Sequence, residues 1–335
     1  MQFITDPAIT IKIRQMKQRV RWQESSIIAR NIDQTRLVID DPQIDNPEFS
    51  FLVIGDSGTG RHRGHHPQRE ITKLLLNQSD YHPRFILHTG DVVYLTGSAG
   101  YYPHNFIKPY REFIVGGDNY KQIAYDQMLF NLPFLPIPGN HDYYNLPLFY
   151  GAMAELTWPI RRLFGSRVAF DVSWRGSRSG DAYARAFLDY LQGFNNPNDL
   201  ERHLDQYYTA ETSTGRCLRY QPNQFTRLPN RYYTFRYGGI DFFALDSNTF
   251  NAPIPIPNSQ EGVEQRRQLV QRQRDLEQQK QELIIESETL NPDHPEQAEQ
   301  LDDIQAKIEQ IDETQFDIEK QLKAGPNSDI DIEQL

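Results

Sequence analysis

Three short apolar segments, each closed by a polar residue beside glycine, constrain the fold of this chain more than any other feature. They are Phe49–Ile54 before Gly55-Asp56, Arg84–His88 before Gly90-Asp91, and Phe134–Ile137 before Gly139-Asn140. A helix is expected at residues 69–78, between the first two. Apolar β-forming runs that alternate with helices are typical of a buried, partly parallel sheet. In such sheets the functional groups lie just past the carboxyl ends of the strands, so the sequence predicts an α/β fold with a polar site there.

The polar residues after these segments are of the types that bind hard metal ions. Taken alone, a Gly-Asp pair after a strand is usually a turn, because aspartate bonds its own backbone there. Taken together, Asp56 and Asp91 offer carboxylate oxygens and Asn140 an amide oxygen, the ligands that hard divalent or trivalent ions prefer. His141 follows Asn140 and is placed to donate a proton to a leaving oxygen.

The order Gly-Asp, Gly-Asp-x-x-Tyr, Gly-Asn-His-Asp resembles the calcineurin-like metallophosphoesterase superfamily. Most members have a histidine in the first motif where this chain has Gly58. This chain instead has Tyr94, three residues after Asp91. That exchange is similar to the purple acid phosphatase type, in which a tyrosine phenolate binds a ferric ion. The resemblance covers about residues 49–250 and implies hydrolysis of phosphate esters.

The resemblance implies a role for each motif residue. Asp56 and Tyr94 would bind the first metal ion, Asp91 would bridge both ions, and Asn140 would bind the second. His141 would contact the phosphate or act as the acid from outside the coordination shell. The cofactors would be two metal ions, iron plus a divalent iron, zinc or manganese ion, and the substrate a phosphate ester. The implied fold is a four-layer α-β-β-α sandwich.

The chain departs from the family pattern after Asn248. The family supplies three more histidines there, in a Gly-His pair and a Gly-His-x-His motif, whereas this chain has only His294. His62, His65 and His66 lie in a loop that we expect to be solvated, and they are not assigned as replacements. We therefore expect a C-terminally truncated member that lacks half of one sheet. It would be incomplete or inactive without a complementing C-terminal polypeptide.

The domain organisation follows from changes of composition along the chain. Residues 1–48 are expected to be an N-terminal extension with one strand at Ala8–Ile13. Residues 49–258 would form the catalytic domain, with a loop-rich insert at 143–230 and a hairpin made by Arg231–Tyr237 and Ile240–Leu245. Residues 324–335 would begin a truncated family helix.

Residues 259–323 show a helical repeat of apolar residues. Leu269, Leu276, Leu283 and Leu290 recur at intervals of seven. A second run follows a 3-4 spacing, interrupted at Gln315, and prolines separate the two runs. This pattern predicts an antiparallel coiled-coil hairpin, which could bind a coiled-coil partner. A single polar helix beside a disordered stretch is the alternative.

Composition excludes several classes of function. The net charge of −10 and pI near 5.4 argue against nucleic-acid binding, which needs lysine and arginine. The single cysteine, Cys217, allows no disulfide within the chain. No apolar run has the length of a signal peptide or a membrane span, so we expect a cytoplasmic protein without a membrane partner. Besides a phosphoesterase, the sequence leaves open a non-catalytic remnant or interaction protein that uses the helical hairpin.

Overall fold

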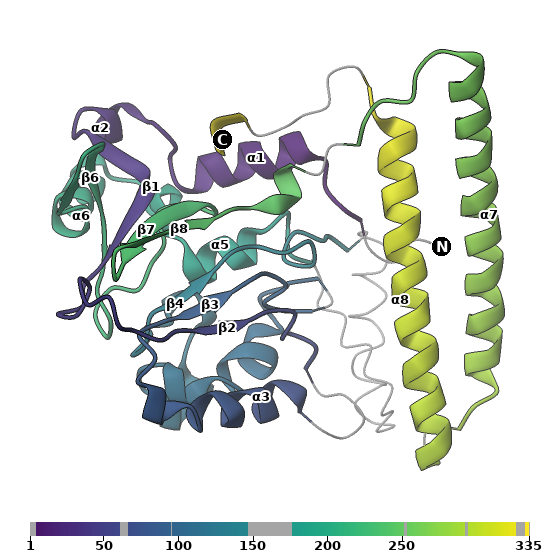
Figure 1. Cartoon of the computed structure of the whole chain (residues 1–335), viewed down its shortest axis with the longest axis horizontal. Coiled ribbons are helices and arrows are strands. Elements are labelled where there is room, and N and C mark those ends of the chain that lie inside the picture. The colour runs from purple at the N-terminus through teal and green to yellow at the C-terminus, as the bar shows by residue number, and fades with distance from the viewer. Residues whose placement is uncertain are drawn as a thin grey trace. The chain divides into compact units, whose positions relative to one another are not determined.

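The computed structural model describes residues 5–60, 66–94, 96–146, 176–250, 253–291, 294–325 and 332–334. These residues fall into two compact units. The larger unit contains every described strand, and the smaller unit contains the two long helices α7 and α8 (Figure 1). The structure is a mixed α/β fold with a central sheet region and several helices.

A three-stranded parallel sheet carries the three sequence motifs. Its order is β2 (Leu52–Ile54), β3 (Ile86–His88) and β4 (Phe134–Pro136). Ile54 pairs with His88, and His88 pairs with Pro136, so the three strands end at the same level. The helix α3 (Pro67–Leu76) follows β2. The parallel strands and the helix predicted between the first two are confirmed.

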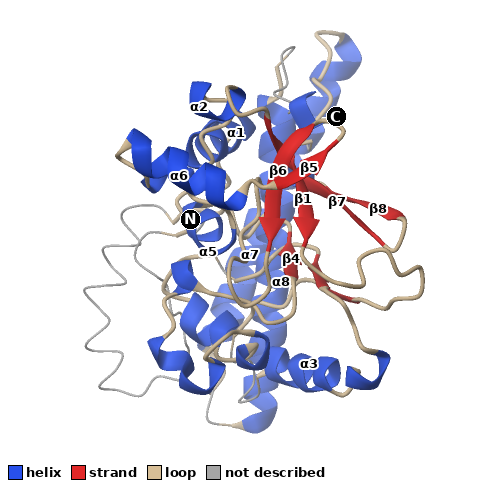
Figure 2. Ribbon diagram, turned by 90° about the vertical axis from the view of Figure 1, so that its left-hand side faces the viewer, coloured by secondary structure: helices blue, strands red, loops and turns tan. Residues whose placement is uncertain are grey.

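A five-stranded sheet forms the second part of the larger unit. Its order is β5 (Ala210–Thr212), β6 (Gly215–Tyr220), β1 (Ile32–Ile39), β7 (Tyr233–Tyr237) and β8 (Ile240–Ala244). β1 runs parallel to both of its neighbours, β6 and β7 (Figure 2). β7 and β8 form the predicted antiparallel hairpin. Gly238 and Gly239 form its turn with φ of 56° and 82°, a conformation that glycine adopts at little cost.

The strand expected at Ala8–Ile13 is wrong, because α1 spans Ile9–Arg19. The alternation of isoleucine with polar residues in this segment imitates the period of a strand. Burial follows the helical period instead, with Lys12, Met16 and Arg19 on the buried face. Lys12 also forms an ion pair with Asp6 at 2.7 Å. β1 is a further element that the sequence analysis did not expect within residues 1–48.

The remaining elements are short. In the predicted loop-rich insert, residues 147–175 lie outside the described part of the chain, and β5 and β6 were not expected. Among the described residues, the other α-helices are α2 (Ser25–Ile28), α5 (Asp181–Phe187) and α6 (Pro197–Tyr207). One π-helical turn, η2, spans Pro103–Ile107. The 3₁₀ turns are Ser79–Tyr81, Arg111–Phe113, Gly117–Gln122, Tyr125–Gln127, Leu191–Gly193, Ser247–Thr249 and Ile332–Gln334.

Aromatic side chains join the two sheets. Phe85 lies beside β3 and packs edge-on against Phe235 of β7 and Phe242 of β8, each at 5.4 Å between ring centroids. Phe51 packs against Phe242 at 5.5 Å. Edge-to-face contacts of this kind add to the hydrophobic stabilisation of burial. The sheets therefore face each other across an aromatic core.

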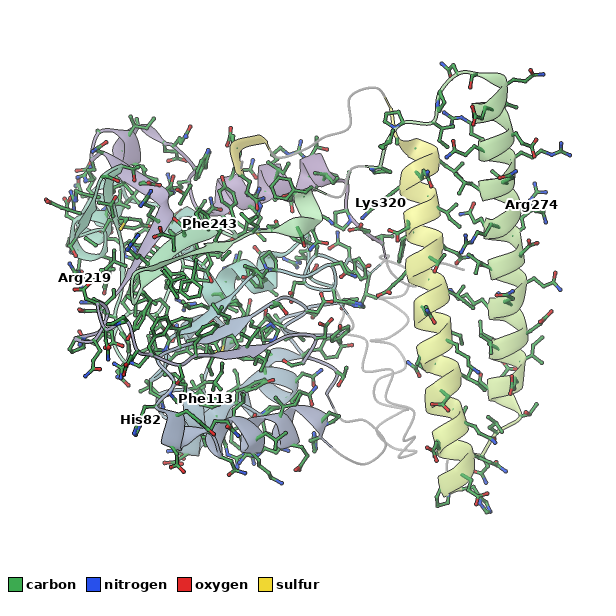
Figure 3. All side chains as sticks on the ribbon, in the orientation of Figure 1. His82, Phe113, Arg219, Phe243, Arg274 and Lys320 are labelled. Atoms are coloured by element: carbon green, nitrogen blue, oxygen red, sulfur yellow. The ribbon has the colours of Figure 1, made fainter. Side chains whose placement is uncertain are left out.

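The smaller unit contains α7 (Gln260–Glu288) and α8 (Pro295–Lys323). The Ser259 hydroxyl accepts the Gly262 N–H at 3.2 Å and caps α7. Lys280 bonds Asp312, and Gln315 donates to Glu277 at 3.2 Å, so the two helices run in opposite directions. Arg274 projects from α7 (Figure 3). Among the described residues, no helix has both the length and the apolar character to cross a bilayer.

The buried ion pair between α7 and α8 gives a first prediction. The Lys280 side chain is 1% exposed and that of Asp312 is 13% exposed. Asp312→Ala removes this carboxylate from a buried ammonium, so we expect the helices to lose on the order of 3 kcal/mol of stability. Lys280→Met combined with Asp312→Leu should restore most of it, because apolar pairs replace buried ion pairs well. Hydrogen exchange of α7 and α8 amides measures both effects.

The control for this prediction is Glu319→Ala. Glu319 pairs with Lys323, whose side chain is 73% exposed, and exposed pairs contribute less than about 1 kcal/mol. Equal losses for Asp312→Ala and Glu319→Ala would contradict a special role for the buried pair.

A second polar cluster ties the segment after β1 to β3 and β7. Arg84 donates to Asp41 through Nε at 2.9 Å, and the Tyr237 hydroxyl donates to Asp41 at 2.6 Å. Burial alone would raise the pKa of the Asp41 carboxyl, but the bonds from Arg84 and Tyr237 outweigh it and hold the pKa below its ordinary value. The ionised carboxylate is therefore the form that stabilises the fold.

This depressed pKa sets a pH dependence. The contribution of Asp41 is complete above its unfolded pKa of about 4 and is lost as the pH falls through the lower folded pKa. Asp41→Asn should reduce the free energy of unfolding at neutral pH by about 1–3 kcal/mol and flatten its decline in acid. Urea denaturation across that pH range measures both, with the exposed Asp118→Asn as control. An unchanged acid decline in Asp41→Asn would show that other groups cause it.

Candidate metal centre

The loops after β2, β3 and β4 meet at one edge of the three-stranded sheet. The Asp56 N–H donates to the Gly90 carbonyl at 3.1 Å, which joins the first two loops. Asp56 and Asp91 both have positive φ, 51° and 54°. Such backbone conformations are uncommon outside glycine and cluster at functional sites. The strand ends therefore turn sharply just where the two aspartates occur.

Glycines permit this close approach. A Cβ atom at Gly139 would lie 2.0 Å from the Asp91 Oδ1 atom and 2.3 Å from the Asp91 nitrogen. A Cβ atom at Gly58 would lie 2.3 Å from the Val93 Cα atom. Real Cβ atoms do not approach other atoms this closely, so no side chain fits at either position without moving the backbone. The lack of space beside Val93 therefore explains why residue 58 is a glycine.

Three oxygen-bearing side chains converge where the first two loops meet. The Tyr94 hydroxyl donates to Asp56 Oδ1 at 2.8 Å and lies 3.2 Å from Asp91 Oδ2. Asp56 is exposed, Tyr94 is half-buried and Asp91 is buried. The structure thus brings together three of the four residues predicted as metal ligands.

The third motif contacts this cluster through His141. Its backbone N–H donates to Asp91 Oδ1 at 2.9 Å. Its imidazole lies 4.2 Å from the Tyr94 ring, between centroids, and is buried. Asn140 is half-buried, and its amide donates to the Tyr144 hydroxyl at 2.7 Å. The side chain of Asn140 is thus directed by Tyr144, a partner that the motif did not suggest.

Asp142 holds the second and third loops together. Its Oδ2 atom accepts the N–H of Gly139 at 2.9 Å and that of Val92 at 3.2 Å. The carboxyl is fully buried; burial raises its pKa to about 7, and the charge of Asp91 adds to the shift. Asp142 belongs to the Gly-Asn-His-Asp motif, although no role was predicted for it from the sequence.

His88 of β3 is hydrogen-bonded to both the first and the second loop. The Gly90 N–H donates to His88 Nδ1 at 3.3 Å, and His88 Nε2 lies 2.9 Å from the Ser57 hydroxyl. Burial lowers the pKa of His88 to about 3, so the ring is neutral. Because Nδ1 accepts, Nε2 carries the proton and donates to Ser57. His88 is thus a buried core residue that also links these two loops.

The local electrostatics raise the pKa values of two groups in the cluster. Burial raises the pKa of the Asp91 carboxyl above its ordinary value, and the Asp56 charge adds to this while His141 opposes it. Burial, followed by the charge of Asp91 and the bond to Asp56, raises the pKa of the Tyr94 phenol far above its ordinary range. Neighbouring carboxylates thus favour the neutral phenol.

A family model described as calcineurin-like phosphoesterase matches residues 49–312, more than half of the chain. The chain belongs to the calcineurin-like phosphoesterase family. Members of this family generally bind a dinuclear metal centre, and membership indicates a hydrolase that acts on phosphoesters with metal ions. No curated protein and no solved structure matches the chain.

The described residues fit one side of such a centre. Two carboxylates and a phenol form an oxygen-donor set suited to hard metal ions. In the part of the chain that the structure describes, no three His, Cys, Asp or Glu side chains cluster to hold a metal ion. His62 and His65 lie outside that part. The described residues therefore match the oxygen ligands of such a centre but not its nitrogen ligands.

Asp246, at the end of β8, lies in a separate buried network. Its Oδ2 atom accepts the Tyr143 hydroxyl at 2.7 Å and Arg231 Nε at 2.9 Å. Tyr143 directly follows Asp142, so Asp246 supports the third motif from the five-stranded sheet.

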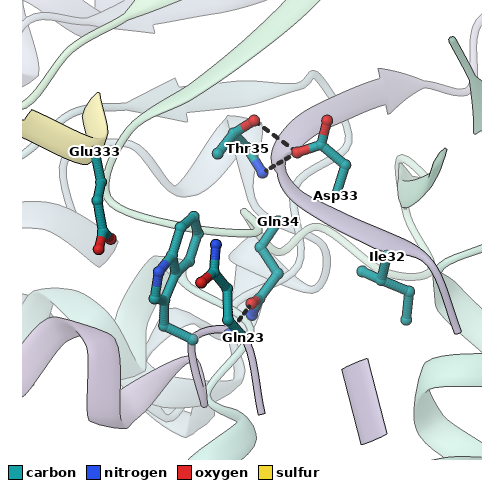
Figure 4. Close-up of a pocket in the computed structure, with 7 residues that line it drawn as sticks. Gln23, Ile32, Asp33, Gln34, Thr35 and Glu333 are labelled. Carbon is teal, nitrogen blue, oxygen red and sulfur yellow. Dashed lines mark hydrogen bonds between the residues drawn. The ribbon is translucent and has the colours of Figure 1, made fainter. Parts of the chain in front are cut away.

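A cavity of about 330 Å³ lies elsewhere in the larger unit (Figure 4). None of its lining residues belongs to the three motifs. Asp33 accepts both the N–H and the hydroxyl of Thr35, and Glu333 pairs with Lys17 at 2.6 Å. These carboxylates already have partners within the fold, and the metal centre remains the better candidate site. The lining residues are Trp22, Gln23, Ile32, Asp33, Gln34, Thr35 and Glu333.

The crowding at Gly139 gives a prediction. Gly139→Ala should push the third loop away from Asp91, and overpacking of this kind costs about 1–3 kcal/mol. Gly193→Ala is the matched control, since its Cβ atom would meet only Tyr190 at 3.8 Å and should change stability by less than about 0.5 kcal/mol. Urea denaturation measures both. If the two variants were equally stable, the three loops would be less tightly packed than the structure shows.

Proposed function

We propose that this chain provides the oxygen-ligand part of a dinuclear, iron-containing phosphoesterase of the purple acid phosphatase type. The observation that carries the proposal is the Tyr94 hydroxyl, which lies within 3.2 Å of carboxylate oxygens from both Asp56 and Asp91. A phenol in that position offers a ligand for a ferric ion, which favours anionic oxygen donors. Gly58 leaves no room for a histidine in the first motif.

Under this proposal each residue has a defined task. Asp56 and Tyr94 would hold the first ion, Asp91 would bind both ions, and Asn140 would hold the second. When bound, the two ions would hold the phosphate ester and lower the pKa of a water molecule that attacks it. His141 is fixed by its backbone bond to Asp91 and would donate the proton to the leaving oxygen. The fold would be the four-layer sandwich of the family.

The nitrogen ligands would come from other polypeptide. The family's Gly-His-x-His motif supplies such ligands, and the printed sequence does not contain that motif. A complementing C-terminal segment would supply these histidines, and the chain would bind metal weakly or be inactive without it. The site is assigned to a phosphate ester in general, not to one ester.

The alternative is a non-catalytic interaction protein. The observation that favours it is the specific polar pairing between α7 and α8, because Lys280–Asp312 and Gln315–Glu277 fix one register of the two helices. A coiled-coil hairpin of defined register could bind a partner without any chemistry at the motif loops.

Addition of ferric ion to the purified chain, with the missing histidine motifs provided as an added segment, tests the first proposal. A phenolate bound to ferric iron absorbs visible light by charge transfer, so the wild type should acquire a visible band. Tyr94→Phe should abolish this band because the phenolate is gone. Tyr81→Phe is the control, since Tyr81 is 72% exposed and should leave the band unchanged.

Hydrolysis of p-nitrophenyl phosphate supplies the functional arm, with the missing histidine motifs provided as an added segment. Asp91→Asn should lower the rate by more than about 100-fold, since changes beside metal ligands alone cost 10- to 100-fold. A visible band that persists in Tyr94→Phe would sink the purple acid phosphatase assignment. Hydrolysis unaffected by Asp91→Asn would favour the interaction protein.

A further inference from the structure

A π-helical turn lies next to the first two motif loops. Within η2 (Pro103–Ile107) the Lys108 N–H reaches back to the Pro103 carbonyl at 3.1 Å. Turns of this kind are rare and occur frequently at functional sites. Phe106 anchors the turn, since its ring is fully buried and packs edge-on against Phe134 of β4 at 5.2 Å. The position of the turn is therefore tied to the sheet that carries the motifs.

Asn105 is the residue of this turn that contacts the motif loops. Its Nδ2 group donates to the Gly58 carbonyl at 3.2 Å and lies 3.4 Å from the Tyr94 carbonyl. The same Gly58 carbonyl accepts the Tyr94 N–H at 3.0 Å. A single amide group thus bridges backbone oxygens of the first and the second motif.

The fit around Asn105 is tight. Gly60 has a φ of 75°, and a Cβ atom there would lie 2.7 Å from Asn105 Oδ1. The loop from Gly58 to Gly60 therefore curves around the Asn105 side chain. In an ordinary turn, an asparagine side chain hydrogen-bonds to backbone groups nearby in the sequence. The Asn105 amide instead hydrogen-bonds to residues 47 and 11 positions away.

The two bridged carbonyls belong to Gly58 and Tyr94, and both residues are close in the chain to the proposed metal ligands. Gly58 lies two residues after Asp56, and Tyr94 bears the phenol that reaches Asp56 at 2.8 Å. Two carbonyl oxygens directed at one point repel each other unless a donor lies between them. Without the Asn105 amide, the Tyr94 N–H bond would still join the two loops at Gly58, but the Gly58 and Tyr94 carbonyls would lose their shared donor.

We propose that Asn105 is a positioning residue that holds the Gly58 loop and Tyr94 together and so sets the separation between the Asp56 carboxylate and the Tyr94 phenol. The inference deepens the proposed function and rests on it for its consequence in metal binding. Its structural part, the coupling of two loops by one amide, is independent of any metal.

Two variants and one control test this role. Asn105→Ala removes the donor, and Asn105→Asp replaces it by an acceptor of the same shape, which should repel both carbonyls. Asn131→Ala is the control, because Asn131 also donates its amide to a carbonyl, that of Glu112 at 2.8 Å, but away from the motifs.

The first measurement is hydrogen exchange of the metal-free full-length chain. Exchange at the Tyr94 amide should rise about five- to tenfold in Asn105→Ala, the effect of one lost hydrogen bond, and more in Asn105→Asp. Asn131→Ala should leave Tyr94 unchanged. An unchanged Tyr94 amide in the Asn105 variants, or a uniform rise across the larger unit, would overturn the proposal.

The second measurement is the visible band on addition of ferric ion, with the missing histidine motifs provided as the same added segment. Both Asn105 variants should shift or weaken the band although Tyr94 is present, and Asn131→Ala should not. An unaltered band would also overturn the role in positioning the phenol. If the wild type forms no band while the Tyr94 amide still exchanges faster in the Asn105 variants, the proposed function fails and the loop coupling by Asn105 stands.

Discussion

The close approach of three strand-end loops is the constraint on which the rest of the site depends. The pairing of Ile54 with His88 and of His88 with Pro136 ends all three strands at one level. Gly58 and Gly139 then let the backbones come together where a single methyl group would collide. Asp142 joins the second and third loops by accepting one N–H from each. The polar side chains converge because the backbones of the three loops that carry them converge.

The parts of the fold that could be predicted from the sequence are those with local signals. β2, β3 and β4 are apolar runs closed by glycine, and the β7–β8 hairpin turns at two glycines. α1 could not be predicted in this way, because Ile9–Ile13 alternates like a strand and only tertiary burial of Lys12 and Met16 reveals the helix. β1 was missed because its pairing partners lie about 180 residues or more away, as in Ile32 with Arg216.

The same distinction applies to the site. Asp56, Asp91, Tyr94 and His141 stand within recognisable motifs, and the structure brings them into contact. Their assignment as metal ligands and acid stays a prediction. Asn105, Tyr144 and the link from His88 to Ser57 carry no local signal, because each depends on a contact between distant segments. Asn105 sits in an ordinary-looking Tyr-Tyr-Pro-His-Asn stretch, and only the π-turn directs its amide at the motif loops.

The replacement of histidine by tyrosine changes what the loops must do. In the common family pattern the first loop supplies an aspartate and a histidine two residues apart, so their separation is fixed by one short stretch of backbone. Here Val93 occupies the space that a side chain at Gly58 would need, and the second oxygen comes from Tyr94 on the other loop. The geometry of Asp56 and Tyr94 is then an inter-loop distance. Such a distance is only as well defined as the bonds between the loops. They include Tyr94 N–H to Gly58, Asp56 N–H to Gly90, the His88 link to Ser57 and the Asn105 bridge. Under the proposed exchange of ligands, the Asn105 bridge would help to fix this distance from outside the motifs.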